Sequence, residues 1–141
     1  MTYRQDLSNS ARRHLRAASE LYGLASAGAQ PGCRAVAGYL FGLCGELAVK
    51  AIMRDSGMPP LEPDRRREDP YYKHFPELKT FLLNTAKGRR SGELLTIANT
   101  SALFRYWDTD MRYAKTLDIR DEWIESWKTS ATDLVNRMDS F

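Results

Sequence analysis

Hydrophobic residues recur every three or four positions along most of the chain, with polar residues between them. This spacing is the period of an α-helix that buries one face. Near the N-terminus the stripe consists of Leu7, Ala11, His14, Ala18, Leu21 and Ala25. Near the C-terminus it consists of Trp123, Trp127, Ala131, Leu134, Met138 and Phe141. The stripes predict a first helix over residues 3–27 and a last helix that starts near Asp118, and no segment has the alternating pattern of a strand.

Residues 34–55 differ from these two helices because they have almost no polar face. The stretch AGYLFGLCGELAVKAIM within them holds only two charged residues, Glu46 and Lys50, one helical turn apart. A helix that is apolar all round is typical of the centre of a bundle. Glycine within a helix costs about 1 kcal/mol relative to alanine, so each one needs a reason. The glycines are Gly38, Gly42 and Gly45. They predict the close approach of a neighbouring helix or of a ligand.

Breaks in the hydrophobic pattern separate the remaining helices. Residues 56–75 hold four prolines and a run of charges, which predicts an irregular loop. A third helix is predicted over residues 76–87, with Pro76 near its first turn, where a missing N–H costs little. A fourth is predicted over residues 93–114, with Ser91 as its N-cap. The predicted fold class is all-α, a single-domain, four- to five-helix up-and-down bundle over residues 1–141.

Composition and charge narrow the class of protein only slightly. The chain has 141 residues, of which 43% are hydrophobic and 28% charged, as is usual for one globular domain. Its net charge of +3 permits contact with nucleic acid but does not require it. Cys33 and Cys44, about 16 Å apart on one helix, are beyond disulfide reach and are predicted to be reduced. The polar N-terminus and the charges of residues 34–55 argue against a secretory leader and a membrane span, so we expect a cytoplasmic protein.

Two charged pairs are candidates for chemistry. Glu46 and Lys50 are either an ordinary ion pair at a helix edge, worth about 0.3–0.5 kcal/mol, or a polar centre inside a groove. A charge on so apolar a helix requires a partner, because an unpaired buried charge is very costly. Asp108 and Arg112 form the second pair, which is either surface electrostatics or a means of pointing Arg112 toward Glu46. Trp107 and Tyr113 beside it are predicted to pack into the core.

Three stretches resemble one known family. AGYLFGLCGELAVKAIM, then HFPELKTFL, then WDTDMRYA are similar to HEPN domains (higher eukaryotes and prokaryotes nucleotide-binding) over about residues 35–114. In that family a helix rich in small residues carries a Glu and then a Lys, a His opens the next helix, and an Arg-Tyr pair follows later. The matching residues here are Glu46, Lys50, His74, Arg112 and Tyr113.

The resemblance implies a small helical bundle, often a homodimer, from bacterial toxin–antitoxin or defence systems. In many members it also implies metal-independent RNA cleavage by an Arg and a His separated by four to six residues. This chain has no His after His74, so the usual position of that motif is empty. Only Arg67 and His74 have a matching separation, within a loop interrupted by prolines. His74 is therefore either a general base or a locally hydrogen-bonded residue at a helix start.

Other polar residues have weaker signals. His14 lies on an apolar stripe and is expected to be a hydrogen-bonded core residue, and the two histidines and two cysteines have no metal-ligand spacing. The basic stretches Arg65–Arg67 and Lys87–Arg90, with Arg12, Arg13 and Arg16, form either a phosphate-attracting face or solvated charge. Tyr71 and Tyr72 are candidates for stacking on unpaired bases.

Three functional hypotheses follow. The first is a HEPN-like binding protein without cofactor or metal, in which Lys50 and Arg112 hold an anionic group of RNA or a nucleotide and Glu46 orients Arg112. Tyr113 lines the groove and His74 lies at its mouth, and a nucleotidyltransferase-type protein encoded nearby is a possible partner. The second is a divergent ribonuclease that uses His74 with Arg67 or Arg112. The third is a homodimeric interaction protein without a ligand, anchored by Trp123 or Trp127 on the last helix.

Overall fold

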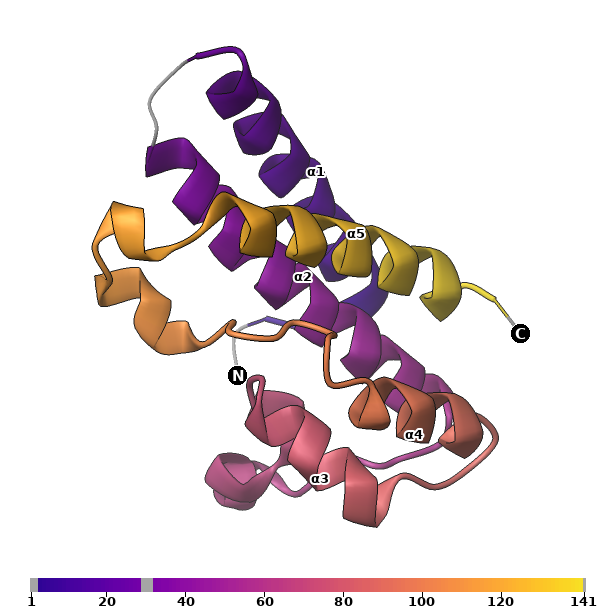
Figure 1. Cartoon of the computed structure of the whole chain (residues 1–141). Coiled ribbons are helices and arrows are strands. Elements are labelled where there is room, and N and C mark those ends of the chain that lie inside the picture. The colour runs from indigo at the N-terminus through magenta and orange to yellow at the C-terminus, as the bar shows by residue number, and fades with distance from the viewer. Residues whose placement is uncertain (1–2, 29–31, 141) are drawn as a thin grey trace.

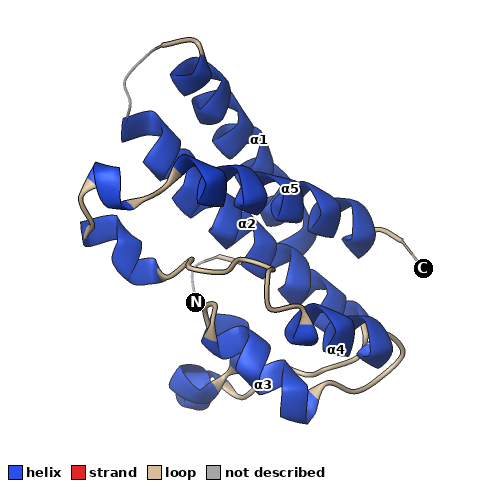
Figure 2. Ribbon diagram, viewed as in Figure 1, coloured by secondary structure: helices blue, strands red, loops and turns tan. Residues whose placement is uncertain are grey.

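The computed structural model describes residues 3–28 and 32–140, and this part of the chain contains helices and no strand (Figure 2). Its α-helices are α1 (Leu7–Ser26), α2 (Gly32–Asp55), α3 (Glu77–Thr85), α4 (Ser91–Asn99) and α5 (Asp121–Met138). Four short 3-10 helices lie between them: η1 (Pro63–Glu68), η2 (Pro70–Tyr72), η3 (Thr109–Tyr113) and η4 (Thr116–Asp118). The all-α prediction is confirmed.

The apolar helix α2 is the centre of the bundle, as its sequence predicted. Helices α1 and α5 pack on it and on each other, and the short helices α3 and α4 pair near its C-terminal end (Figure 1). Phe41, Ile52 and Met53 of α2 are fully buried. Helix α2 is also long and apolar enough to cross a membrane by length and composition, and 67% of that window is buried inside the fold.

The glycines of α2 form a groove that aromatic rings fill. A Cβ on Gly42 would lie 1.9 Å from the Trp107 ring, and one on Gly45 would lie 2.3 Å from the Phe104 ring. The Trp107 indole N–H donates to the Gly38 carbonyl at 3.2 Å. The close approach predicted from these glycines is confirmed, and the groups that approach are side chains of the protein itself.

The predicted helix over residues 93–114 is wrong, because α4 ends at Asn99. Beyond it Phe104 and Tyr106 adopt φ values of +53° and +70°, which no right-handed helix contains. These two conformations turn the chain so that both Phe104 and Trp107 enter the groove of α2. Ser91 is not the N-cap, since Arg90 holds that position without a side-chain capping bond.

Helices α1 and α5 both begin later than the sequence predicted. Helix α1 begins at Leu7 rather than Tyr3, because the Asp6 side chain accepts the Asn9 N–H and caps the helix. Helix α5 begins at Asp121, after η4, and its buried face agrees with the predicted stripe. That face consists of Ile124, Trp127, Ala131, Leu134, Val135 and Met138. Phe141, the last residue of the predicted stripe, lies outside the described residues.

Residues 56–75 are more ordered than the prolines predicted, since they contain η1 and η2. The Asp69 carboxylate accepts the backbone N–H groups of Leu61 and Tyr71, at 3.2 and 3.0 Å. The Tyr71 hydroxyl donates to the Met58 carbonyl at 2.5 Å, and the Tyr71 side chain is buried. These bonds order the segment internally, and His74 and Phe75 at its end bind Glu46 of α2.

Candidate functional site

Glu46 lies at a buried polar centre between α2 and the start of α3. Its side chain is 2% exposed, and both carboxylate oxygens are hydrogen-bonded. One oxygen lies 2.8 Å from His74 Nδ1, and the other accepts the Phe75 backbone N–H at 2.8 Å. The predicted polar centre is therefore present, but its partner is His74 rather than Arg112.

His74 is held at one nitrogen and open at the other. An ionised carboxylate only accepts hydrogen bonds, so the proton of a neutral His74 ring belongs on Nδ1 when Glu46 is charged. The His74 side chain is 50% exposed, and its Nε2 has no hydrogen-bond partner among the described residues. The His74 carbonyl accepts the Leu78 N–H, which fixes the backbone of His74 to the start of α3.

Lys50 lies one turn after Glu46 and is 5% exposed. Its ammonium makes no hydrogen bond or ion pair with any residue in the described ranges. Burial lowers the pKa of Lys50, and the negative charges of Glu46 and Asp69 act against that decrease. Lys50 thus lies near two carboxylates without direct contact with either.

Burial acts on Glu46 in the opposite direction. Loss of solvent raises the pKa of Glu46, while the hydrogen bond from His74, the charge of Lys50 and the Phe75 N–H oppose the increase. Glu46 and His74 are therefore joined by a direct hydrogen bond, and Lys50 adds a charge to this centre without direct contact. Such a centre can grip an anion through a protonated His74 or accept a proton at a neutral His74 Nε2.

Arg112 and Tyr113 do not join this centre, which corrects the predicted groove. Both belong to η3, where Arg112 Nε donates to the Thr109 carbonyl at 3.0 Å and the guanidinium lies over the Tyr113 ring. Tyr113 is 81% exposed and not in the core, while Trp107 is buried as predicted. Asp108 accepts the Asp110 N–H and forms no ion pair with Arg112. Helix α4 ends at Asn99, and η3 lies instead against the part of α2 that precedes Glu46, where Arg112 lines a groove with Val36 and Tyr39.

The histidines and Arg67 have separate environments. Arg67 is exposed on η1 and makes no hydrogen bond or ion pair with His74, although the side chains of both are described. The predicted catalytic pair is therefore not assembled in this structure. His14 Nδ1 lies 2.7 Å from the Ser10 carbonyl, so the predicted hydrogen bond is present, but the side chain is half-buried on α1 rather than in the core.

The basic stretches are partly structural. Arg65 pairs with Glu68, and Arg66 lies over the Tyr72 ring, while the burial of Tyr71 removes it from any stacking role. Arg90 is buried and donates to Glu93, to Asp55 and to the last carbonyls of α5. Arg89 also pairs with Asp55. The Lys87–Arg90 stretch therefore does not form a free cationic face.

Two members of the polar centre were not predicted from the sequence. Asp69 is 3% exposed and acts on Lys50 at long range, and the Phe75 N–H binds Glu46 directly. An Asp directly before a Pro is typical of a turn, and this pattern is the sequence feature that could have predicted the hydrogen bonds of Asp69. A backbone N–H has no sequence signal at all.

Both cysteines are free thiols, as predicted. Cys44 is buried, its Sγ donates to the Ala11 carbonyl at 3.3 Å, and burial raises its pKa to about 12. Among residues 3–28 and 32–140, no group of three or more His, Cys, Asp or Glu side chains is placed to hold a metal ion. Comparison of the chain with protein-family models, with curated proteins and with solved structures gave no significant match.

Proposed function

We propose that the protein is a HEPN-like helical bundle that acts by binding, and that Glu46, Lys50 and His74 form its ligand centre. The ligand is an anionic group of a nucleic acid or nucleotide. His74 presents its outer nitrogen to that group, Glu46 orients the His74 ring through Nδ1, and Lys50 adds a nearby positive charge. The proposal rests mainly on one observation: buried Glu46 fixes the His74 ring while half of that side chain remains exposed.

The energetics of the centre support a ligand role. Holding two acids and one amine inside a bundle costs stability unless each has a partner. Glu46 and Asp69 accept hydrogen bonds, whereas the Lys50 ammonium has no acceptor within the described part of the chain. A lysine whose pKa is lowered by burial, beside a half-exposed imidazole, is a candidate for a functional site.

Nucleic-acid binding across a salt series tests the proposal. Fluorescence anisotropy of labelled single-stranded RNA is measured with wild type, with His74→Ala and with His14→Ala, which removes the same side chain elsewhere. We expect wild-type affinity to fall steeply with salt, His14→Ala to match wild type, and His74→Ala to bind several-fold more weakly. Equal affinities for the two variants, or no binding at low salt, would contradict the proposal.

A ribonuclease is the second candidate, and the geometry of His74 favours it. Glu46 holds His74 Nδ1 and leaves Nε2 able to accept a proton, as a general base must. Neither Arg67 nor Arg112 contacts His74, so an anionic transition state would depend on Lys50 or on an arginine supplied from outside the bundle. Cleavage of the labelled RNA that disappears in His74→Ala would support this candidate, and cleavage that persists undiminished would exclude a role for His74.

A toxin–antitoxin or defence-type setting, with a nucleotidyltransferase-type protein as partner, belongs to the same proposal. It draws support only from the residue pattern shared with HEPN domains. Gene neighbourhood and co-purification with a neighbouring gene product are the direct tests. A neighbouring nucleotidyltransferase that co-elutes with the protein would support the setting, and separate elution of the two proteins would count against it.

A further inference from the structure

Two stacked aromatic rings, Tyr106 and Trp123, join the turn after α4 to the first turn of α5 and reach the surface. The ring centroids lie 4.6 Å apart, with an angle of 28° between the planes. Tyr106 is 56% exposed, and Trp123 is half-buried. Trp127, which the sequence suggested together with Trp123 as an interaction anchor, is 1% exposed and therefore buried. We call Tyr106 and Trp123 the aromatic stack.

The backbone holds Tyr106 in this position at a cost. Its φ of +70° lies in the left-handed region, which glycine and asparagine adopt more readily than an aromatic residue. The residues on both sides are fixed, since Trp107 is buried and the Arg105 carbonyl accepts the Trp127 indole N–H at 2.9 Å. The core requires this turn but not a large, mostly exposed ring within it. An uncommon conformation at an exposed aromatic residue points to a role for the ring itself.

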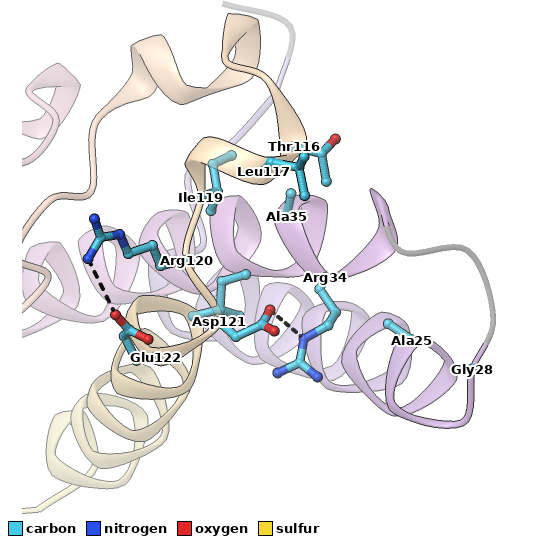
Figure 3. Close-up of a pocket in the computed structure, with 11 residues that line it drawn as sticks. Ala25, Gly28, Arg34, Ala35, Thr116, Leu117, Ile119, Arg120, Asp121 and Glu122 are labelled. Carbon is cyan, nitrogen blue, oxygen red and sulfur yellow. Dashed lines mark ion pairs between the residues drawn. The ribbon is translucent and has the colours of Figure 1, made fainter.

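Two arginines flank the aromatic stack. The Arg105 guanidinium lies 4.8 Å from the Tyr106 ring centroid and makes no hydrogen bond or ion pair with a residue of the described ranges. The Arg120 guanidinium lies 5.4 Å from the Trp123 ring centroid and pairs with the exposed Glu122 at 3.7 Å (Figure 3). Neither guanidinium is fixed by a buried partner, so both can bind an anionic group beside the rings.

A groove extends from the aromatic stack toward the ligand centre proposed above. It has a volume of about 360 Å³, and its lining includes Arg105 and Tyr106. Phe75 and Pro76, the two residues directly after His74, also line it. A chain-like ligand bound at His74 can therefore follow this groove to the aromatic stack.

The combination of rings and arginines defines the ligand by its chemistry. Exposed aromatic rings stack on nucleic-acid bases, and arginine binds phosphate. Bases offer their faces to a protein where they are unpaired, because neighbouring pairs cover them in a duplex. A quaternary ammonium, which aromatic sites also bind, would be repelled by the two arginines. An acidic peptide would pair with the arginines but leave the rings without a planar partner.

We propose that the aromatic stack and its two arginines bind unpaired bases and phosphates of a single-stranded nucleic acid, which extends from His74 along the groove. The inference deepens the proposed function and rests on it, because it names the form of nucleic acid that the ligand centre receives. It assigns to Tyr106 and Trp123 the stacking role that the sequence suggested for Tyr71 and Tyr72.

Tryptophan fluorescence tests the stack directly, with an oligoadenylate RNA about ten nucleotides long as the probe. The other two tryptophans, Trp107 and Trp127, are buried, so a stacked base quenches mainly Trp123. We expect the single strand to quench wild type. Trp123→Phe, which keeps a ring, should lose the quenching and retain its affinity in fluorescence anisotropy. Binding to wild type without quenching would overturn the proposal.

Competitors for the same probe separate base stacking from charge. Polyphosphate and polyglutamate supply negative charge without a base, and the duplex form of the probe supplies bases whose faces are covered. We expect each of them to compete weakly. Equal competition by any of them would refute stacking on unpaired bases and, for polyglutamate, would favour an acidic protein partner. A DNA strand of the same sequence shows whether RNA or DNA is preferred, and quenching by either strand supports the proposal.

Tyr106→Asn removes the outer ring while asparagine tolerates the left-handed φ of the turn. Tyr113→Asn is the matched control, because Tyr113 is 81% exposed and lies under the guanidinium of Arg112 but stacks on no ring among the described residues. We expect single-strand affinity to be at least about fivefold weaker for Tyr106→Asn and unchanged for Tyr113→Asn. Equal affinities of the two variants would contradict the proposal.

His74→Ala separates the failure of this inference from the failure of the proposed function. Weaker binding by His74→Ala but not by Tyr106→Asn would refute the aromatic stack and leave the ligand centre in place. Weaker binding by Tyr106→Asn but not by His74→Ala would support the stack and refute the ligand centre. Absence of any single-strand binding at low salt would refute both.

Discussion

Two cations are buried to nearly the same extent in this protein, and their surroundings are opposite. Arg90 is 6% exposed and Lys50 is 5% exposed. The Arg90 guanidinium donates to Glu93 at 2.7 Å, to Asp55 at 3.1 Å and to the carbonyls of Arg137 and Met138 at 2.7 and 3.1 Å. Lys50 makes no such bond with the described residues.

The difference separates a structural charge from a functional candidate. Arg90 joins the C-terminal ends of α2 and α5 to the start of α4, and its planar fork satisfies helix-end carbonyls that have no partner within α5. Lys50 is a point charge, and no direct hydrogen bond to a described residue offsets the cost of burying it. One buried cation therefore stabilises the fold by its contacts, whereas the other is expected to contribute little stability and to act on a ligand.

The largest effect is expected at Arg90. Arg90→Met removes four hydrogen bonds of one buried guanidinium, to Asp55, to Glu93 and to two carbonyls of α5, so we expect the free energy of unfolding to fall by about 3–5 kcal/mol even though Arg89 still pairs with Asp55. Urea denaturation followed by circular dichroism measures it. Arg89→Met, which removes a half-exposed cation from the same carboxylate, is the control and should cost under about 1 kcal/mol. Similar losses in the two variants would refute a structural role specific to Arg90.

The second-largest loss of stability is expected for substitution of Glu46. Glu46→Leu leaves the Phe75 N–H and His74 Nδ1 without an acceptor, so we expect a loss of about 1–3 kcal/mol in the free energy of unfolding. Glu46→Gln keeps an acceptor for Phe75 and should lose less. Its amide can only donate to His74, which moves the imidazole proton from Nδ1 to Nε2. Nitrogen NMR of the His74 ring measures the tautomer, and an unchanged tautomer would show that Glu46 does not orient the ring.

Substitution of Lys50 tests whether this buried cation, unlike Arg90, contributes little to stability. Lys50→Met removes a buried charge without breaking a described contact, so we expect the free energy of unfolding to stay within about 1 kcal/mol of wild type or to rise. RNA binding should weaken at the same time. Lys87→Met, which removes an exposed lysine, is the control for loss of net charge. A destabilisation as large as that of Arg90→Met would place Lys50 among the structural charges.

The pH dependence of Lys50 provides a related measurement. Burial lowers the pKa of Lys50 below its ordinary value of 10.5, so between the two values the unfolded chain binds a proton that the native chain has lost. Stability contributed by this group must therefore rise with pH across that window. We expect urea midpoints of Lys50→Met to rise less with pH than those of wild type. Lys79 and the tyrosines are present in both proteins, so their effects on the pH dependence cancel when the urea midpoints of the variant are subtracted from those of wild type.

The smallest effect is expected at Arg112. The sequence placed this residue against Glu46, but the structure exposes it on η3 with only local contacts. Arg112→Ala should change the free energy of unfolding by less than about 0.5 kcal/mol and leave the His74 ring resonances in place. A shift of those resonances would show that Arg112 reaches the centre after all.

Much of the scaffold was predictable because it depends on local periodicity. The stripes of α1 and α5 and the apolar surface of α2 follow from residue spacing, and burial follows from the free energy of removing apolar groups from water. The glycines of α2 predicted the close approach of another group, because glycine destabilises a helix and close packing against it can offset that loss. The apolar surroundings of Glu46 and Lys50 made a buried polar centre one of the two interpretations of this pair.

Which groups surround Glu46 and Lys50 was decided only by the tertiary structure. The fourth helix ends at Asn99, and beyond it Phe104 and Tyr106 adopt left-handed conformations in a turn from which the Phe104 and Trp107 rings enter the groove of α2. That single change moved Arg112 and Tyr113 to another surface and left Glu46 to pair with His74. The amino-acid pattern determined which side chains must leave water. Which donor meets which acceptor depended on turns whose geometry is fixed by contacts between distant parts of the chain.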